Sequence, residues 1–253
     1  MKICHAIFSS NRLEYLEKAL ESHSYLNYNG IKVDRLLIDD YPFNRDDSLF
    51  EQIAKKHSIN RLYLNKTNLG ITKNWQYLFD IVNNDNYDYI LHQEDDVRLL
   101  EKIDLQLLVD VFKHDKNLRQ IQLARNNWYP EDKDNPFYPK DTDIVYKQYC
   151  YDLKNDLFPM MFSLYPSWIC REPLFEELQM YPSEGTLGWY LKTKYSNLYT
   201  AIFKNKNSKS IIEHYGEYSQ GRKVTEIDPG WETFKKYDPL KKYDSISGKV
   251  YTK

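Results

Sequence analysis

The sequence predicts an α/β fold in which a mainly parallel, doubly wound sheet is flanked by helices. Two observations support this class. Short apolar runs alternate with segments whose apolar residues recur at helical spacing, which is typical of the crossover units that build parallel sheets. The length of 253 residues also suits one large domain of this kind. We therefore expect a single domain over 1–253, regular over 1–124 and less regular over 125–253.

Four strand-and-helix pairs and one further strand are expected in the regular half. The first strand, 3–8, is a largely apolar run of the type found in buried strands. The helix after it, over 11–23, carries Leu13, Leu16 and Leu20 at helical spacing. The same succession predicts strands at 33–38, 60–64, 87–92 and 119–123, and helical faces at 49–54, 71–82 and 105–112.

The second half shows weaker periodicity. Residues 126–156 are rich in Asn, Asp, Pro and Tyr, which predicts a long loop or insert of the kind that forms a lid or a binding wall. Ordered structure should resume over 158–169. Helices are then expected at 173–180 and 184–195, and strands at 198–203 and 210–212. No internal repeat or low-complexity linker divides the chain, so we expect no separate domains.

Composition and charge argue against nucleic-acid binding, disulfide bonds and a membrane span. The net charge of −2 provides no global basic field, so stable nucleic-acid binding is not expected. The three cysteines, Cys4, Cys150 and Cys170, lie far apart and lack the spacing of a disulfide framework or zinc site, which favours a reducing compartment. No apolar run approaches the ~20 residues of a membrane span, and the N-terminal run is too short for a signal peptide. We expect a cytoplasmic protein.

Three consecutive carboxylates follow the fourth predicted strand: Glu94, Asp95 and Asp96. In an extended chain Glu94 and Asp96 point to one side and Asp95 to the other. Such crowding is costly unless a cation is shared, and Mg²⁺ or Mn²⁺ binds carboxylate oxygens together with substrate phosphates. The pattern therefore favours a metal site. The alternative is a solvated acidic turn before a helix, where carboxylates are also favoured.

Polar residues also follow the three preceding strands, at 9–12, 39–40 and 65–70. In parallel sheets these positions share the carboxyl edge, where ligands bind. Their order resembles that of the GT-A-type glycosyltransferases, in particular the large inverting family that uses nucleoside-diphosphate sugars. That family has a Ser-x-Asn-Arg-like turn, one or two Asp residues, an Asn-x-Gly segment with a later Asn, and a DxD-like metal motif. The resemblance covers 3–97.

The resemblance implies a role for each matching residue. Residues 1–124 would bind a UDP- or GDP-type sugar, and 125–253 would bind a glycan or another acceptor with a hydroxyl group. Asp39 and Asp40 would face the base and ribose. The donor-binding residues implied are Ser9, Asn11, Arg12, Asp39, Asp40, Asn68, Gly70, Asn74, Glu94 and Asp95. Asp96 would be the metal ligand, with Mn²⁺ or Mg²⁺ as cofactor, and Glu94 stands where the family has Asp.

Later residues complete the implied site. His214 matches the family's late His-x-Gly segment, whose His can join the metal site, although a strand-end His is also common without an ion. Glu184 begins a predicted helix and would be the catalytic base, and Trp189 would offer an apolar face to the acceptor sugar. Asp152 and Glu213 are lesser candidates for the base. Inversion at the sugar carbon is implied by the resemblance alone.

The sequence lacks the motifs of several other enzyme classes with such a fold. The chain has no G-x-G-x-x-G fingerprint, no phosphate-binding G-x-x-x-x-G-K-[ST] loop and no glycine-flanked Ser elbow. A sugar nucleotidyltransferase remains an alternative, although 9–12 lacks the glycine-rich, basic first loop of that class. A catalytically inactive glycan-binding protein of the same fold is the alternative from outside the enzymes.

Overall fold

The computed structural model of the chain describes the first half almost completely and the second half in short segments. The described residues are 1–114, 118–123, 144–145, 167–170, 199–203, 210–215, 218–219, 222–223, 241–243 and 250–252. The helices expected at 173–180 and 184–195 lie outside this part of the chain.

The regular half contains the strands and helices that the sequence predicts, with ends shifted by a few residues. Its main elements are β1 (Lys2–Ser9), α1 (Leu13–Glu21), β3 (Lys32–Asp39), α2 (Asp47–Lys56), β4 (Arg61–Leu64), α3 (Gly70–Asn84), β5 (Tyr89–Glu94), α4 (Leu105–His114) and β8 (Leu118–Leu123). Shorter elements lie between them: the 3-10 helix η1 (Ser22–Tyr25), β2 (Leu26–Asn27), β6 (Val97–Leu99) and β7 (Ile103–Asp104).

The second half contributes short strands to the described structure. They are β9 (Ile144–Val145), β10 (Ser167–Cys170), β11 (Tyr199–Phe203), β12 (Ile212–His214), β13 (Tyr218–Ser219), β14 (Arg222–Lys223), β15 (Lys241–Tyr243) and β16 (Val250–Thr252). The strand expected at 198–203 is confirmed as β11. The strand expected at 210–212 lies two residues later, because the residues that pair with β6 run from Ile212 to His214.

The main sheet is mainly parallel, as predicted. Its strand order is β4-β3-β1-β5-β10-β8-β11-β9. Strands β4, β3, β1 and β5 pair in parallel, whereas β10 runs antiparallel to both β5 and β8. The last predicted strand of the first half, β8, therefore does not pair with β5. Apolar periodicity predicts a strand but not which strands pair with it. The position of β10 between β5 and β8 could therefore not be predicted from the sequence.

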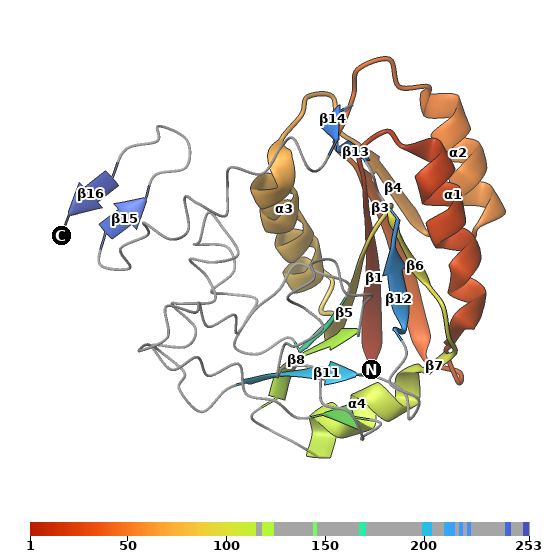
Figure 1. Cartoon of the computed structure of the whole chain (residues 1–253), viewed down its shortest axis with the longest axis vertical. Coiled ribbons are helices and arrows are strands. Elements are labelled where there is room, and N and C mark those ends of the chain that lie inside the picture. Colours follow the sequence, from red (N-terminus) through yellow and green to blue (C-terminus); the bar gives the residue numbers. More distant parts are fainter. Residues whose placement is uncertain are drawn as a thin grey trace.

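Helices cover both faces of the sheet, with α1 and α2 on one side and α3 on the other (Figure 1). Successive residues of β1 point to opposite faces, so Ile7 packs with Leu16 and Phe50 while Phe8 packs with Trp75. Phe50 is completely buried. Burial of a side chain of this size contributes about 1.5–3 kcal/mol, so the two apolar layers account for much of the stability of this half.

The small sheet β6–β12 joins residues 212–214 to the segment after Asp96. Ile212 pairs with Leu99, and His214 pairs with Val97. All of these apolar side chains are buried in one cluster with helix α4. Residues far apart in the sequence are thereby fixed side by side next to Asp96.

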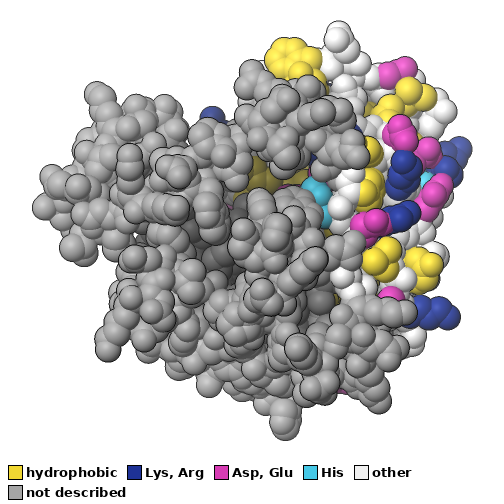
Figure 2. Space-filling model, viewed as in Figure 1, with side chains coloured by type: hydrophobic (Ala, Val, Ile, Leu, Met, Phe, Trp, Pro, Cys, Tyr) yellow, Lys and Arg dark blue, Asp and Glu magenta, His cyan; other side chains and the backbone are white. Residues whose placement is uncertain are grey.

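The surface of the described part carries charges of both signs. On the face seen in Figure 2, Lys and Arg side chains are interspersed with Asp and Glu over the region of α1 and α2. Several form pairs, such as Lys18 with Glu14 and Lys56 with Glu17. Among the described helices, none is both long enough and apolar enough to cross a bilayer.

A polar cluster lies within the core beneath β1, β5 and η1. The Gln93 Nε2 group donates to the Val97 carbonyl at 2.8 Å, which leaves the Gln93 Oε1 atom to accept from His5 Nε2 at 3.2 Å and His23 Nε2 at 3.0 Å. Both histidines are buried. Burial lowers the pKa of His23 to about 3 and that of His5 well below its usual value, so both imidazoles are neutral in the folded protein.

We expect acid to destabilise the fold through these histidines. An unfolded histidine gains its proton below about pH 6.5, whereas folded His23 stays neutral down to about pH 3. The free energy of unfolding should therefore fall with pH across this window, by at most about 1.4 kcal/mol per pH unit for each histidine. Replacement His23→Gln should reduce this slope, measured by urea unfolding between pH 7 and pH 5. His57→Gln, at a half-buried position, is the control and should reduce it less.

Candidate active site

Four parallel strands end side by side at one edge of the sheet. Ser9, the last residue of β1, is in register with Asp39, the last residue of β3, and Asp39 is in register with Leu64 of β4. On the other side of β1, Phe8 is in register with Glu94 at the end of β5. The polar segments that the sequence placed after each strand are therefore neighbours, as predicted.

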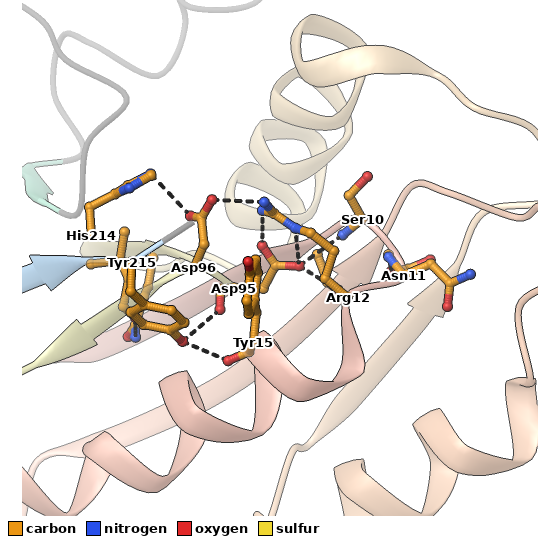
Figure 3. Close-up of polar contacts among 12 residues, drawn as sticks. Ser10, Asn11, Arg12, Tyr15, Asp95, Asp96, His214 and Tyr215 are labelled. Atoms are coloured by element: carbon orange, nitrogen blue, oxygen red, sulfur yellow. Dashed lines mark hydrogen bonds and ion pairs between the residues drawn. The ribbon is translucent and has the colours of Figure 1, made fainter. Parts of the chain in front are cut away.

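Arg12 binds two of the three consecutive carboxylates (Figure 3). It occupies the N-cap position of α1. Its Nε group donates to Asp95 Oδ2 at 3.2 Å, its Nη1 group donates to Asp96 Oδ2 at 2.8 Å, and its Nη2 group donates to Asp95 Oδ1. The resemblance implied that Arg12 binds the donor. In the structure it supplies the counter-charge for the acidic segment.

Asp95 is an anchor for the turn after β1. Its carboxylate is 1 % exposed and also accepts hydrogen bonds from Ser9 Oγ and from the Ser10 amide, both at 3.1 Å. Burial raises the pKa of the Asp95 carboxyl to about 6, and the Arg12 guanidinium opposes this shift. Both oxygens are thus engaged by the protein itself, and the implied donor-binding residues Ser9 and Asp95 bind each other.

Glu94, Asp96 and His214 form a candidate metal site. Each offers a ligand atom, and these atoms lie within 4.8 Å of one another. Asp96 is 5 % exposed, yet its Oδ1 atom makes no hydrogen bond and lies 3.4 Å from His214 Nε2. A buried carboxylate oxygen without a hydrogen bond is unfavourable unless another partner satisfies it. Two carboxylates and one imidazole are suitable ligands for a divalent cation such as Mn²⁺.

Tyr215 connects this cluster to α1 and was not singled out from the sequence. Its amide donates to the Asp96 carbonyl at 2.9 Å. Its hydroxyl oxygen lies 2.6 Å from the Tyr15 carbonyl oxygen and 3.0 Å from that of Asp95 (Figure 3). Burial, together with the nearby acidic groups, raises the pKa of the Tyr215 phenol, so it remains a hydrogen-bond donor at neutral pH. Its position directly after His214 was the only signal available in the sequence.

Asp39 is completely buried and bound by the protein. Its carboxylate accepts hydrogen bonds from the Asn11 amide at 2.6 Å, the Tyr41 amide at 3.2 Å and Arg45 Nη1 at 3.0 Å. Asn11 has a positive φ of 54°, a conformation that asparagine tolerates better than most residues. Asp39 thus fixes the turn between β1 and α1 and the loop after β3.

Asp40 binds the beginning of α3. It accepts from the Leu69 amide at 2.8 Å, the Gly70 amide at 2.7 Å and Asn65 Nδ2 at 2.9 Å. The amide groups at a helix N-terminus lack partners within the helix and favour a carboxylate. Gly70 has a φ of +77°, which disfavours side chains at this junction.

The expected donor-binding asparagines belong to the same network. Asn65 Nδ2 also donates to Asn74 Oδ1 at 2.8 Å, and Asn74 Nδ2 donates to the Gly70 carbonyl at 3.1 Å. Asn68 Oδ1 accepts from the Gly70 amide at 3.1 Å. Asn74 is buried, whereas Asn68 is exposed at the edge of the sheet. Of the two, Asn68 is therefore the residue that solvent reaches.

Among the expected acceptor-side residues, the structure describes Glu213. Glu184, Trp189 and Asp152 lie outside the described residues. Glu213 is described and forms an ion pair with Arg98, with Nε and Oε2 2.5 Å apart. Because successive side chains of a strand point to opposite faces, Glu213 points away from the face that carries His214.

Comparison with solved structures supports the fold. The chain is similar to residues 1–349 of TarS from S. aureus in complex with UDP, with a TM-score of 0.57 and 14% identity over 84% of this chain and 60% of that one. The same protein in complex with UDP-GlcNAc gives a TM-score of 0.56 and 12% identity, over 87% and 60% of the two chains.

A further neighbour is the mannosyltransferase PcManGT from Pyrobaculum calidifontis in complex with GDP-Man and Mn²⁺. It matches with a TM-score of 0.57 and 12% identity, over 87% of this chain and 58% of that one. This chain therefore spans about 60% of the length of these neighbours. No family model and no curated protein sequence matches it. The similarity establishes a GT-A-like α/β fold, as the sequence predicted.

We expect replacement of Arg12 to lower the free energy of unfolding, because Arg12 binds the carboxylates at the end of β5. Replacement Arg12→Gln leaves Asp95 buried without its counter-charge, and breaking a buried ion pair in this way costs about 3–5 kcal/mol. The measurement is urea unfolding at pH 7. Lys18→Gln, which removes an exposed ion pair on the same helix, is the control and should change stability far less. Equal effects of the two substitutions would show that the Arg12 pairs contribute little.

Proposed function

We propose that this chain is a metal-dependent glycosyltransferase that moves a sugar from a nucleoside-diphosphate sugar to an acceptor hydroxyl. The observation that carries the proposal is the Asp96 Oδ1 atom, buried without a hydrogen bond between Glu94 and His214. It lies at the carboxyl edge of a GT-A-like sheet. Neighbours with this fold bind UDP, UDP-GlcNAc or GDP-Man, which supports a nucleotide sugar as the donor.

The residues present suit a divalent cation. Asp96 would bind it through Oδ1, because Oδ2 is held by Arg12, and Glu94 and His214 would supply two further ligands. Bound Mn²⁺ or Mg²⁺ provides a Lewis acid that stabilises negative charge on a departing diphosphate. The Mn²⁺ bound to the mannosyltransferase neighbour favours manganese.

Other residues of the chain fix this arrangement. Arg12 and the Ser10 amide bind Asp95, so only Glu94 and Asp96 of the acidic triplet would be available to the cation. The amides at the start of α3 are already bound by Asp40. The diphosphate charge is therefore compensated at the metal site and not at this helix end.

The acceptor side of the proposal rests on the second half of the chain. Glu184 would remove the proton from the acceptor hydroxyl as it attacks the sugar, and Trp189 would stack on the acceptor. Direct attack of this kind inverts the configuration at the sugar carbon. The acceptor would be a glycan or another molecule with an available hydroxyl group.

We expect Asp96→Asn to abolish metal-dependent donor binding, because an uncharged amide oxygen is a weaker ligand for a hard cation. The measurement is calorimetric titration of UDP and GDP with and without Mn²⁺. Asp110→Asn, at an exposed position of α4, is the control and should bind as wild type does. Unchanged Mn²⁺-dependent binding by the Asp96 variant would refute the metal site.

We expect Glu184→Gln to lower transfer while leaving donor binding near the wild-type value, because a base acts in the chemical step. The loss in single-turnover rate should be about 10²–10⁴-fold. Donor affinity and transfer should be measured on the same preparation. Transfer within a few-fold of wild type would assign the role of base to another carboxylate.

Pyrophosphate release and saccharide binding, measured beside these assays, separate the two alternative functions. A sugar nucleotidyltransferase would release pyrophosphate from a nucleoside triphosphate and a sugar phosphate. An inactive glycan-binding protein would bind saccharides without metal-dependent binding of a nucleotide.

A further inference from the structure

The two aspartates at the end of β3 are each held by three hydrogen bonds from the protein itself. Asp39 is completely buried and accepts three hydrogen bonds, including one from Arg45. Asp40 likewise accepts three, from Asn65 and from two amides at the start of α3. A carboxylate has about four acceptor sites, so each aspartate retains about one site for a further donor. The two carboxylates can therefore contribute little to base recognition.

An exposed aromatic side chain lies in the loop that directly follows these aspartates. Phe43 is 60 % exposed, more than any other large apolar side chain in the described ranges. Its ring packs edge-on against Tyr41, with centroids 5.1 Å apart and planes at 61°. The contact with Tyr41 leaves most of Phe43 exposed, so its apolar surface is available for a flat ligand to cover.

The backbone of this loop is held in place on both sides of Pro42. The Asn11 Nδ2 group donates to the Phe43 carbonyl at 3.0 Å, and the Tyr41 amide donates to Asp39 Oδ1 at 3.2 Å. The ring is thus presented on a fixed support, which lowers the entropic cost of binding a flat ligand.

The loop lies at a suitable distance from the metal site. Strand β3 is two strands away from β5, which corresponds to roughly 10 Å at the usual spacing between strands. Asn11, which binds the loop, lies on the opposite side of Arg12 from His214 (Figure 3). A nucleoside diphosphate whose phosphates meet Asp96 can extend along this edge, and its base then reaches the loop after β3.

We propose that Phe43, supported by Tyr41, is the stacking surface for the nucleobase of the donor. This inference rests on the proposed function. Stacking on an aromatic ring tolerates every base because each base has a π-face. Because each aspartate retains only about one acceptor site, the site holds the base mainly by stacking and discriminates weakly between uracil and guanine.

The test is calorimetric titration of the full chain at saturating Mn²⁺ with three probes: UDP, GDP and inorganic pyrophosphate. Replacement Phe43→Ala should weaken UDP and GDP binding by about 5- to 150-fold, the range measured when a stacking ring is removed. Pyrophosphate, which has no base, should bind both proteins equally. Phe43→Trp should retain nucleotide affinity. Leu107→Ala, at an exposed position of α4, is the matched control and should have no effect.

Two outcomes overturn the inference while leaving the proposed function intact. In one, pyrophosphate and both nucleotides bind, but Phe43→Ala changes no affinity. In the other, Phe43→Ala weakens pyrophosphate binding as much as nucleotide binding, which would show that the ring does not act on the base. Failure of all three probes to bind with Mn²⁺ would overturn the proposed function and this inference together.

Discussion

One guanidinium group makes the acidic edge of this protein possible. Three carboxylates in succession repel one another at the end of a buried strand, and burial adds a desolvation cost. Arg12 binds Asp95 through two nitrogens and Asp96 through a third, and so compensates part of this charge. The same contacts attach the start of α1 to the end of β5. Because one oxygen of Asp96 is held in this way, the other faces Glu94 and His214.

Much of the fold was predictable because each element of the first half is specified locally. Apolar runs of strand length and apolar residues at helical spacing gave β1, β3, β4, β5 and the helices between them, with errors of a few residues at the ends. The candidate metal ligands were also predicted: Glu94 and Asp96 from their place after a buried strand, and His214 from a resemblance to a known family. The structure brings these three together.

The roles of the neighbouring residues were not predictable, because pairing between side chains is a property of the folded chain. Asp39 and Asp40 stand at the strand end where a ligand is expected, yet Arg45 and the amides at the start of α3 bind them. Phe43 gave no signal, since a single aromatic residue in a loop has no period and no motif, and Tyr215 gave none beyond its place after His214. The position of β10 between β5 and β8 was not predictable either, because these strands are far apart in the sequence.

The pairing of β12 with β6 also determines when the site can form during synthesis. The strands β4, β3, β1 and β5 and the residues that Arg12 binds all precede residue 97, so they leave the ribosome early. His214 and Tyr215 emerge much later and must then pair with a segment that is already in place. Contacts between such distant residues are slow to form. A nascent chain would thus contain the acidic segment for a time without His214, the third candidate metal ligand.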